Sequence, residues 1–252
     1  MTARADTPPD VTSRSQDPAA DRSVWGVAAR PVAAVLGTLA RLRSGPAIHA
    51  VGTSYAATVE VLGADVTGRP VGLPFVDDAG RYRASVRLSR AAGLPTALPD
   101  VLGFALRVEA DGHEPQDLLL DSCWSGPLGR HLIRPGWSVP DAWYGSLLAY
   151  SAGEAVVHLA ATGEPTEEAV GPEPGPGVDH DTATGRRFRL MLAGPLESDW
   201  STWARVTLAE PVARPELRFS PAHDGLGIRL RADGTVFRVP SYRASQRAGP
   251  FD

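Results

Sequence analysis

Apolar and polar residues alternate along most of the chain between residues 47 and 209. A period of two is typical of β-strands. It predicts strands over residues 47–63, 81–88, 104–110, 116–120, 154–161, 186–193 and 203–209. Gly, Pro and Asp fill the links between them. Many strands joined by turn-rich links, with few helices, predict a mainly β protein built as an antiparallel barrel, because the first strand is too long for a small sandwich.

The period changes before the first strand. Between Val24 and Leu42 the apolar residues recur every three or four positions, which predicts an amphipathic helix that ends at Ser44-Gly45-Pro46. The first 22 residues mix charges with Pro and Ser and predict a disordered arm. The expected organisation is therefore an arm (1–22), a helical segment (23–45) and a barrel domain (46–252). Within the barrel, residues 163–185 carry six acidic residues, no basic one and four prolines, which predicts a solvated loop.

Composition narrows the chemistry. The 252 residues have a formal net charge of −4, which gives little support to nucleic-acid binding. All 25 basic residues are arginine, so lysine Schiff-base chemistry and a P-loop are excluded. A single cysteine, Cys123, excludes an internal disulfide and favours a reducing, cytoplasmic compartment. The sequence contains no run of eighteen apolar residues, so no membrane-spanning helix is predicted.

The residues themselves offer one candidate for acid–base chemistry. The sequence has no HExxH, GxGxxG or nucleophile-elbow motif. His49, however, interrupts an apolar strand start, Ala47-Ile48-His49-Ala50. An imidazole titrates near neutral pH and can pass a proton in either direction. His49 is therefore either a hydrogen-bonded core histidine or the acid/base of a pocket.

Five blocks of the sequence resemble, in the same order, segments of the catalase family. They are IHAVGTSYAATVEV (48–61), VRLSRAAG (86–93), PDVLGFALRV (99–108), QDLLLDS (116–122) and WSTWARVTLAEPVARPELRFSP (200–221). The match spans about Ala47 to Arg247 with a shortened middle, so the chain is similar to the small catalase-related haem proteins. The resemblance implies a catalase-like antiparallel β-barrel with an N-terminal helix and a short C-terminal helix. It also implies a haem-dependent peroxidase-like or hydroperoxide-converting oxidoreductase that binds haem b.

The same resemblance implies roles for residues on the distal side of the haem. His49 would take a proton from bound peroxide and return it to the leaving oxygen. Ser89 would hydrogen-bond that imidazole and fix its tautomer. Arg87 falls where the family has an arginine close to a haem propionate. Ser122 stands where the family has a distal asparagine that orients peroxide.

On the proximal side the family has an Arg-x-x-x-Tyr signature whose phenolate binds iron. Arg238 and Tyr242 have that spacing. A phenol with a pKa of about 10 must lose its proton to bind iron well, and an arginine one helical turn away favours the anion. Tyr242 would then be the metal ligand, with Arg238 supporting it. The alternative is a surface tyrosine in an arginine-rich tail.

Two departures from the family pattern change the expected activity. Ser122 replaces the asparagine, which predicts slower peroxide disproportionation, and Pro46 replaces an arginine, which weakens one propionate contact. Two haem-free alternatives stay open: a module that binds a small apolar ligand in the barrel mouth, and a phosphodiester hydrolase with His49 as base and Arg87 as anion clamp. The expected partner is peroxide or a small organic hydroperoxide, with no nucleic acid and no membrane. The oligomeric state does not follow from the sequence, and a homodimer is one option.

Overall fold

The computed structural model describes residues 51–95, 97–165, 183–213 and 217–231. Ten strands lie within these residues: β1 (Val51–Val61), β2 (Gly80–Arg90), β3 (Leu102–Glu109), β4 (Gln116–Ser122), β5 (Trp143–Gly145), β6 (Tyr150–Ala152), β7 (Ala155–Gly163), β8 (Arg187–Ala193), β9 (Ser201–Pro211) and β10 (Ile228–Leu230). The predicted arm, the predicted helix between residues 24 and 42, and the short C-terminal helix lie outside the described residues.

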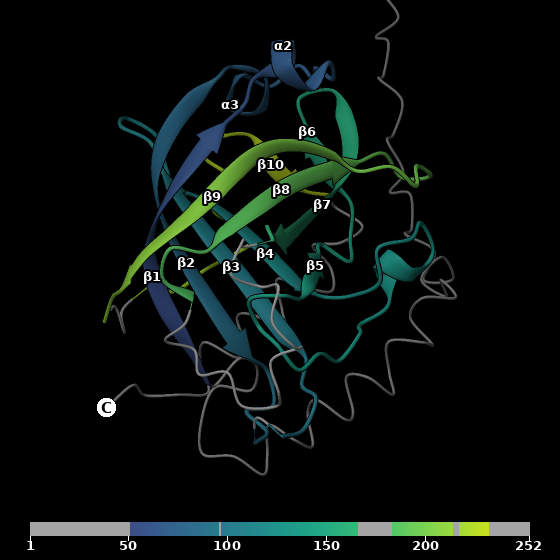
Figure 1. Cartoon of the computed structure of the whole chain (residues 1–252). Helices are drawn as coiled ribbons and strands as arrows, with labels where there is room; N and C mark the ends of the chain where they lie inside the picture. Colours follow the sequence, from purple (N-terminus) through teal and green to yellow (C-terminus); the bar gives the residue numbers. More distant parts are fainter. Residues whose placement is uncertain (1–50, 96, 166–182, 214–216, 232–252) are drawn as a thin grey trace, which may run out of the picture.

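Eight of these strands close into an antiparallel barrel (Figure 1). The ring runs β1-β2-β3-β4-β5-β7-β8-β9 and returns to β1. β6 and β10 form a small extension, because β6 pairs with the first residues of β7 and β10 pairs with β6. Closure leaves no unpaired edge between neighbouring strands of the ring. The predicted antiparallel barrel is confirmed.

Large apolar side chains fill the barrel interior. Every second residue of each strand points inward, as the period of two requires, and these residues form one core that includes Tyr55, Leu88, Phe104 and Phe188. The Phe104 ring lies 5.1 Å from the Phe188 ring and 5.5 Å from that of Tyr144, measured between centroids. The interior of this barrel is therefore a packed core.

One end of the barrel is covered by two short helices that the sequence patterns did not predict, α2 (Ala64–Thr67) and α3 (Pro74–Asp77). Pro74 begins α3, and the Asp77 carboxylate accepts hydrogen bonds from the backbone N–H groups of residues 71, 72 and 73. Phe75 of α3 is buried against Tyr82 and Trp203 in edge-to-face contacts. A segment with the composition of a turn therefore adds side chains to the core. Among the described residues, no helix has the length and apolar character needed to span a bilayer.

Candidate functional site

The outward-facing side chains of β1, β2, β3 and β4 form a surface that we call the outer wall. Residues directly opposite one another in an antiparallel sheet point to the same face. One row across this wall consists of Gly52, Ser89, Gly103 and Asp121, and it continues to Gly145 of β5. Four of these five residues are glycine or serine. This row therefore offers little side-chain bulk above the backbone.

Ser89, which the family resemblance assigns to the distal side, lies in this row. It is 3% exposed, and its hydroxyl donates to the Gly103 carbonyl at 3.5 Å. The neighbouring position on β1 must be glycine, because a Cβ at Gly52 would lie 2.5 Å from the Leu88 carbonyl oxygen and 2.7 Å from the Ser89 Cβ. β1 and β2 are thus close together at Gly52, three residues after His49 in the sequence.

Arg87 lies in the next row, between Ser54 on β1 and Ala105 on β3. Its side chain is half-buried, and burial lowers the pKa of its guanidinium from the usual value. An arginine remains protonated under such a shift. The outer wall therefore carries a partly desolvated positive charge beside small side chains, and an anionic group placed there would stabilise that charge.

Ser122, the third distal candidate within the described residues, faces the other side of the sheet. It lies opposite Tyr144, a core residue, and its hydroxyl oxygen accepts a hydrogen bond from the Leu102 N–H at 3.0 Å. The structure thus brings Ser89 and Arg87 together on the outer wall and leaves Ser122 on the inner face. The β4 side chain that shares the row of Ser89 is Asp121, which the sequence comparison with the family pattern did not single out.

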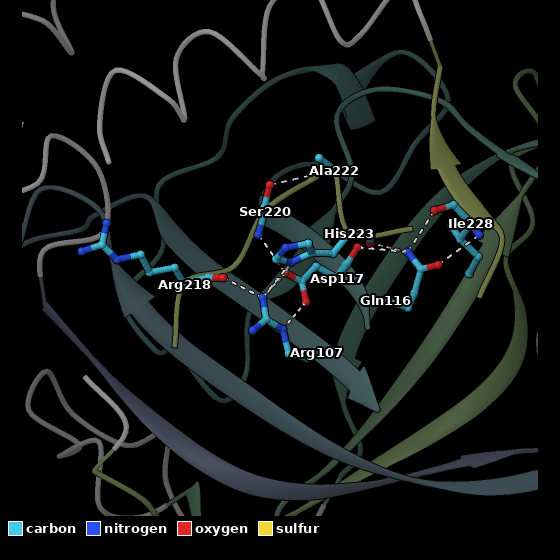
Figure 2. A network of polar contacts seen from close by, with 8 residues as sticks. All are labelled: Arg107, Gln116, Asp117, Arg218, Ser220, Ala222, His223 and Ile228. Atoms are coloured by element: carbon cyan, nitrogen blue, oxygen red, sulfur yellow. Dashed lines mark hydrogen bonds and ion pairs between the residues drawn. The ribbon is translucent and has the colours of Figure 1, made fainter. Parts of the chain in front are cut away.

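A second polar cluster lies further along the outer wall (Figure 2). The Asp117 carboxylate is fully buried and accepts from Arg107 through Nε at 2.7 Å and Nη2 at 2.6 Å. Oδ2 also lies 2.7 Å from the Ser220 N–H and 2.8 Å from His223 Nδ1. Arg107 in turn donates to the Arg218 carbonyl at 2.6 Å. A buried ion pair with this many partners avoids the cost of an unpaired charge.

Gln116, the first residue of β4, binds the chain segment from His223 to Ile228. Its amide NH₂ donates to the carbonyls of Asp117, His223 and Ile228, and its oxygen accepts from the N–H groups of Leu226 and Ile228. The contacts with His223, Leu226 and Ile228 join residues more than 100 positions apart. No local sequence pattern could have revealed this cluster, because His223 follows a turn with no strand or helix periodicity. The one available signal was the pair of polar residues at the start of the QDLLL strand.

The outward side of β7 holds a third cluster. His158 is buried and its ring meets His131 edge to face at 5.0 Å between centroids. Burial, with the positive charges of His131 and Arg130, lowers the pKa of His158 to about 4. Cys123 is buried as the sequence predicts, and burial together with Asp121 raises the pKa of its thiol to about 12. A thiol held in its protonated form is a poor nucleophile.

The remaining predicted site residues, His49, Arg238 and Tyr242, lie outside the described residues. Within the described part of the chain, no group of three or more His, Cys, Asp and Glu side chains is placed to hold a metal ion.

Comparison with known proteins supports the fold. No protein-family model matches the chain, and no curated protein is similar to it in sequence. Among solved structures it is similar to a fungal catalase, at 14% identity with a TM-score of 0.57, over 97% of this chain and 66% of the catalase. It is also similar to catalase A from Saccharomyces cerevisiae, at 12% identity with a TM-score of 0.59, over 96% of this chain and 68% of the yeast protein. A bacterial catalase matches at 12% identity with a TM-score of 0.56, over 98% of this chain and 67% of the catalase.

The chain thus spans about two thirds of the length of these catalases. At this level of identity the similarity shows that the barrel is catalase-like.

Proposed function

We propose that the chain is a haem-dependent oxidoreductase that converts peroxide or a small organic hydroperoxide. The observation that carries this proposal is the outer wall, where a row of small residues lies next to the half-buried guanidinium of Arg87. The catalase-like barrel supports it, because the catalase resemblance of the sequence assigns this same wall to the distal side of a haem.

The residues of the wall fit a flat, anionic group. The row of Gly52, Ser89 and Gly103 has no bulky side chain, so a planar macrocycle can approach the backbone. Arg87 would hold a propionate, because an ion pair offsets the desolvation of its guanidinium. Tyr242, supported by Arg238, would hold the iron. Haem, when bound, would supply the redox centre for the reaction with peroxide.

The chain's own residues would supply the proton transfers. His49 lies outside the described residues, and the catalase resemblance of the sequence assigns it the distal acid/base role. Its imidazole would take a proton from the peroxide and return it to the leaving oxygen. Ser89 Oγ would accept a hydrogen bond from one ring N–H of His49 and fix its tautomer. Ser122, which faces the core, contributes nothing to this step, and slower turnover than in an enzyme with a distal asparagine is expected.

The direct test is an absorption spectrum of the full chain expressed with haem supplied. We expect a Soret band, a haem content of one per chain, and a fall in haem retention of about tenfold in Arg87→Leu, since a partly buried charge pair contributes on the order of 1.4 kcal/mol or more. Arg83→Leu is the matched control, because Arg83 lies on the same face of the same strand with its side chain 82% exposed. The absence of a Soret band at equal protein recovery contradicts the proposal.

Peroxide reactivity tests the proton transfers separately. In haem-loaded protein, His49→Ala should lower the rate of reaction with peroxide by a factor of about 10²–10⁴, the usual contribution of a positioned acid/base. An unchanged rate means that His49 is not the distal residue.

The haem-free alternatives lead to different results in the same experiment. A module that binds an apolar ligand inside the barrel has little support, because buried side chains occupy the inward positions of the described strands. A phosphodiester hydrolase with His49 and Arg87 would instead give a colourless protein that turns over a chromogenic phosphodiester.

A further inference from the structure

His223 is held by its Nδ1 atom while the other side of its ring faces outward. Nδ1 lies 2.8 Å from Asp117 Oδ2 and also 2.8 Å from Arg107 Nη2. The side chain is 37% exposed, whereas the Asp117 side chain is fully buried. Within the described part of the chain, no hydrogen bond or ion pair joins Nε2 of this ring to another residue.

A count of hydrogens selects the tautomer of His223. Arg107 Nη2 carries two hydrogens, and its two closest acceptors, Asp117 Oδ2 and the Arg218 carbonyl, both lie at 2.6 Å. No hydrogen is then left on Nη2 for His223, so Nδ1 must itself carry a proton and donate it to Asp117. In the neutral ring, the basic lone pair is consequently on the exposed Nε2.

We propose that His223 and Asp117 form a second acid–base site on the outer wall, which hydrolyses small uncharged esters by general-base catalysis without a haem. Nε2 takes a proton from a water molecule as the water oxygen forms a bond to the ester carbonyl carbon. The bond from that carbon to the alcohol oxygen then breaks, and the proton passes from Nε2 to the departing oxygen. One ester and one water give one acid and one alcohol, and His223 returns to its starting state.

The charges around the ring determine the class of substrate. Asp117 and Arg107 neutralise each other in a bidentate pair, and His223 is uncharged in its basic form. The site therefore has no net charge to hold an anionic or cationic ester. Asp117 acts as a positioning residue, because it orients the ring and stabilises the imidazolium that forms during the step.

The test uses p-nitrophenyl acetate, an uncharged ester whose phenol product is coloured, and the full chain prepared without haem. His223→Gln should lower the protein-dependent rate by about 10²-fold, at the lower end of what a positioned base contributes. His113→Gln is the matched control, since His113 is an exposed histidine in the turn between β3 and β4 with no carboxylate partner in the described structure. It should leave the rate unchanged. Equal rates in wild type and His223→Gln, or no hydrolysis above buffer, overturn the proposal.

A tautomer measurement keeps the proposal testable if a variant folds poorly. Ring nitrogen NMR of the wild-type protein, with His223 assigned by the His223→Gln spectrum, should show a protonated Nδ1 and an unprotonated Nε2 in the neutral ring. In Asp117→Asn this preference should weaken and the esterase rate should fall, whereas a purely structural Asp117 would leave the tautomer of a folded variant unchanged. A proton on Nε2 in the wild type overturns the assignment of Nε2 as the base.

Discussion

The two faces of the wall formed by β1 to β4 come from the same strands but differ in chemistry. On β2, the inward residues are Ala84, Val86 and Leu88, and the outward ones are Ser85, Arg87 and Ser89. Ser85 and Ser89 are as buried as the core residues beside them. Burial alone therefore does not identify the hydrophobic core of this protein. The two faces differ in the kind of side chain they carry: the inner face has apolar side chains that fill the core, and the outer face has small or polar ones.

The largest effect should come from the inner face. Phe104→Ala removes a ring that contacts both Phe188 and Tyr144 and leaves a cavity, which should cost about 3–5 kcal/mol of unfolding free energy. Urea denaturation followed by tryptophan fluorescence measures this change. A loss below about 1 kcal/mol would mean that the barrel interior is loosely packed, and the contrast between the faces would be much weaker.

The outward cluster on β7 should contribute a pH dependence that the inner face lacks. Because the pKa of His158 is lowered to about 4 by burial and by His131 and Arg130, the folded state binds fewer protons than the unfolded state between pH 6.5 and about 4. Stability should therefore fall as the pH decreases through this window, by about 2 kcal/mol from pH 7 to pH 5.

His158→Leu should remove that part of the decrease, because leucine does not titrate. Denaturation midpoints at pH 7 and pH 5, for wild type and variant, measure the difference. If both proteins lose the same stability on acidification, His158 is not the source.

A bulky side chain on the outer wall should affect the ligand more than the fold. Ala105 lies next to Arg87 in a partly exposed position. In Ala105→Phe we expect haem retention to fall about tenfold or more through steric exclusion, with a change in unfolding free energy below about 1 kcal/mol. Haem titration and denaturation on the same samples separate the two effects. Unaltered haem retention would place the ligand elsewhere.

The smallest effect should come from the exposed end of the same strand. The Arg83 side chain is 82% exposed and its nitrogen lies 3.6 Å from an exposed Asp111 oxygen. Arg83→Ala should change the unfolding free energy by less than about 0.5 kcal/mol, because surface ion pairs contribute little. A larger loss would show that polarity on the outer wall contributes to stability as well as to recognition.

The alternation of residues predicted the long strands well. The predicted ranges 81–88, 116–120 and 186–193 agree with β2, β4 and β8 to within two residues at each end. β5, β6 and β10 were missed, because a strand of three residues is too short to show a period. The position of β5 between β4 and β7 depends on tertiary pairing alone.

The site was less accessible to sequence reasoning. Alternation along β2 puts Ser89 and Arg87 on one face, so that shared face follows from the sequence. Ser122 faces the core because it directly follows the outward-facing Asp121 on β4, and the family pattern does not show this. The Asp117 and His223 pair joins two segments about 106 residues apart, and only the fold brings them together.

The pairing of β1 with β9 determines when the barrel can close during synthesis. β1 ends at Val61 and its second partner ends at Pro211, so 150 residues must follow before the ring can close. At translation rates of about 5–20 residues per second, β9 is synthesised roughly 8–30 s after β1, and until then one edge of β1 has no pairing strand. During that interval the nascent chain presents an unpaired strand edge, which can pair with other chains.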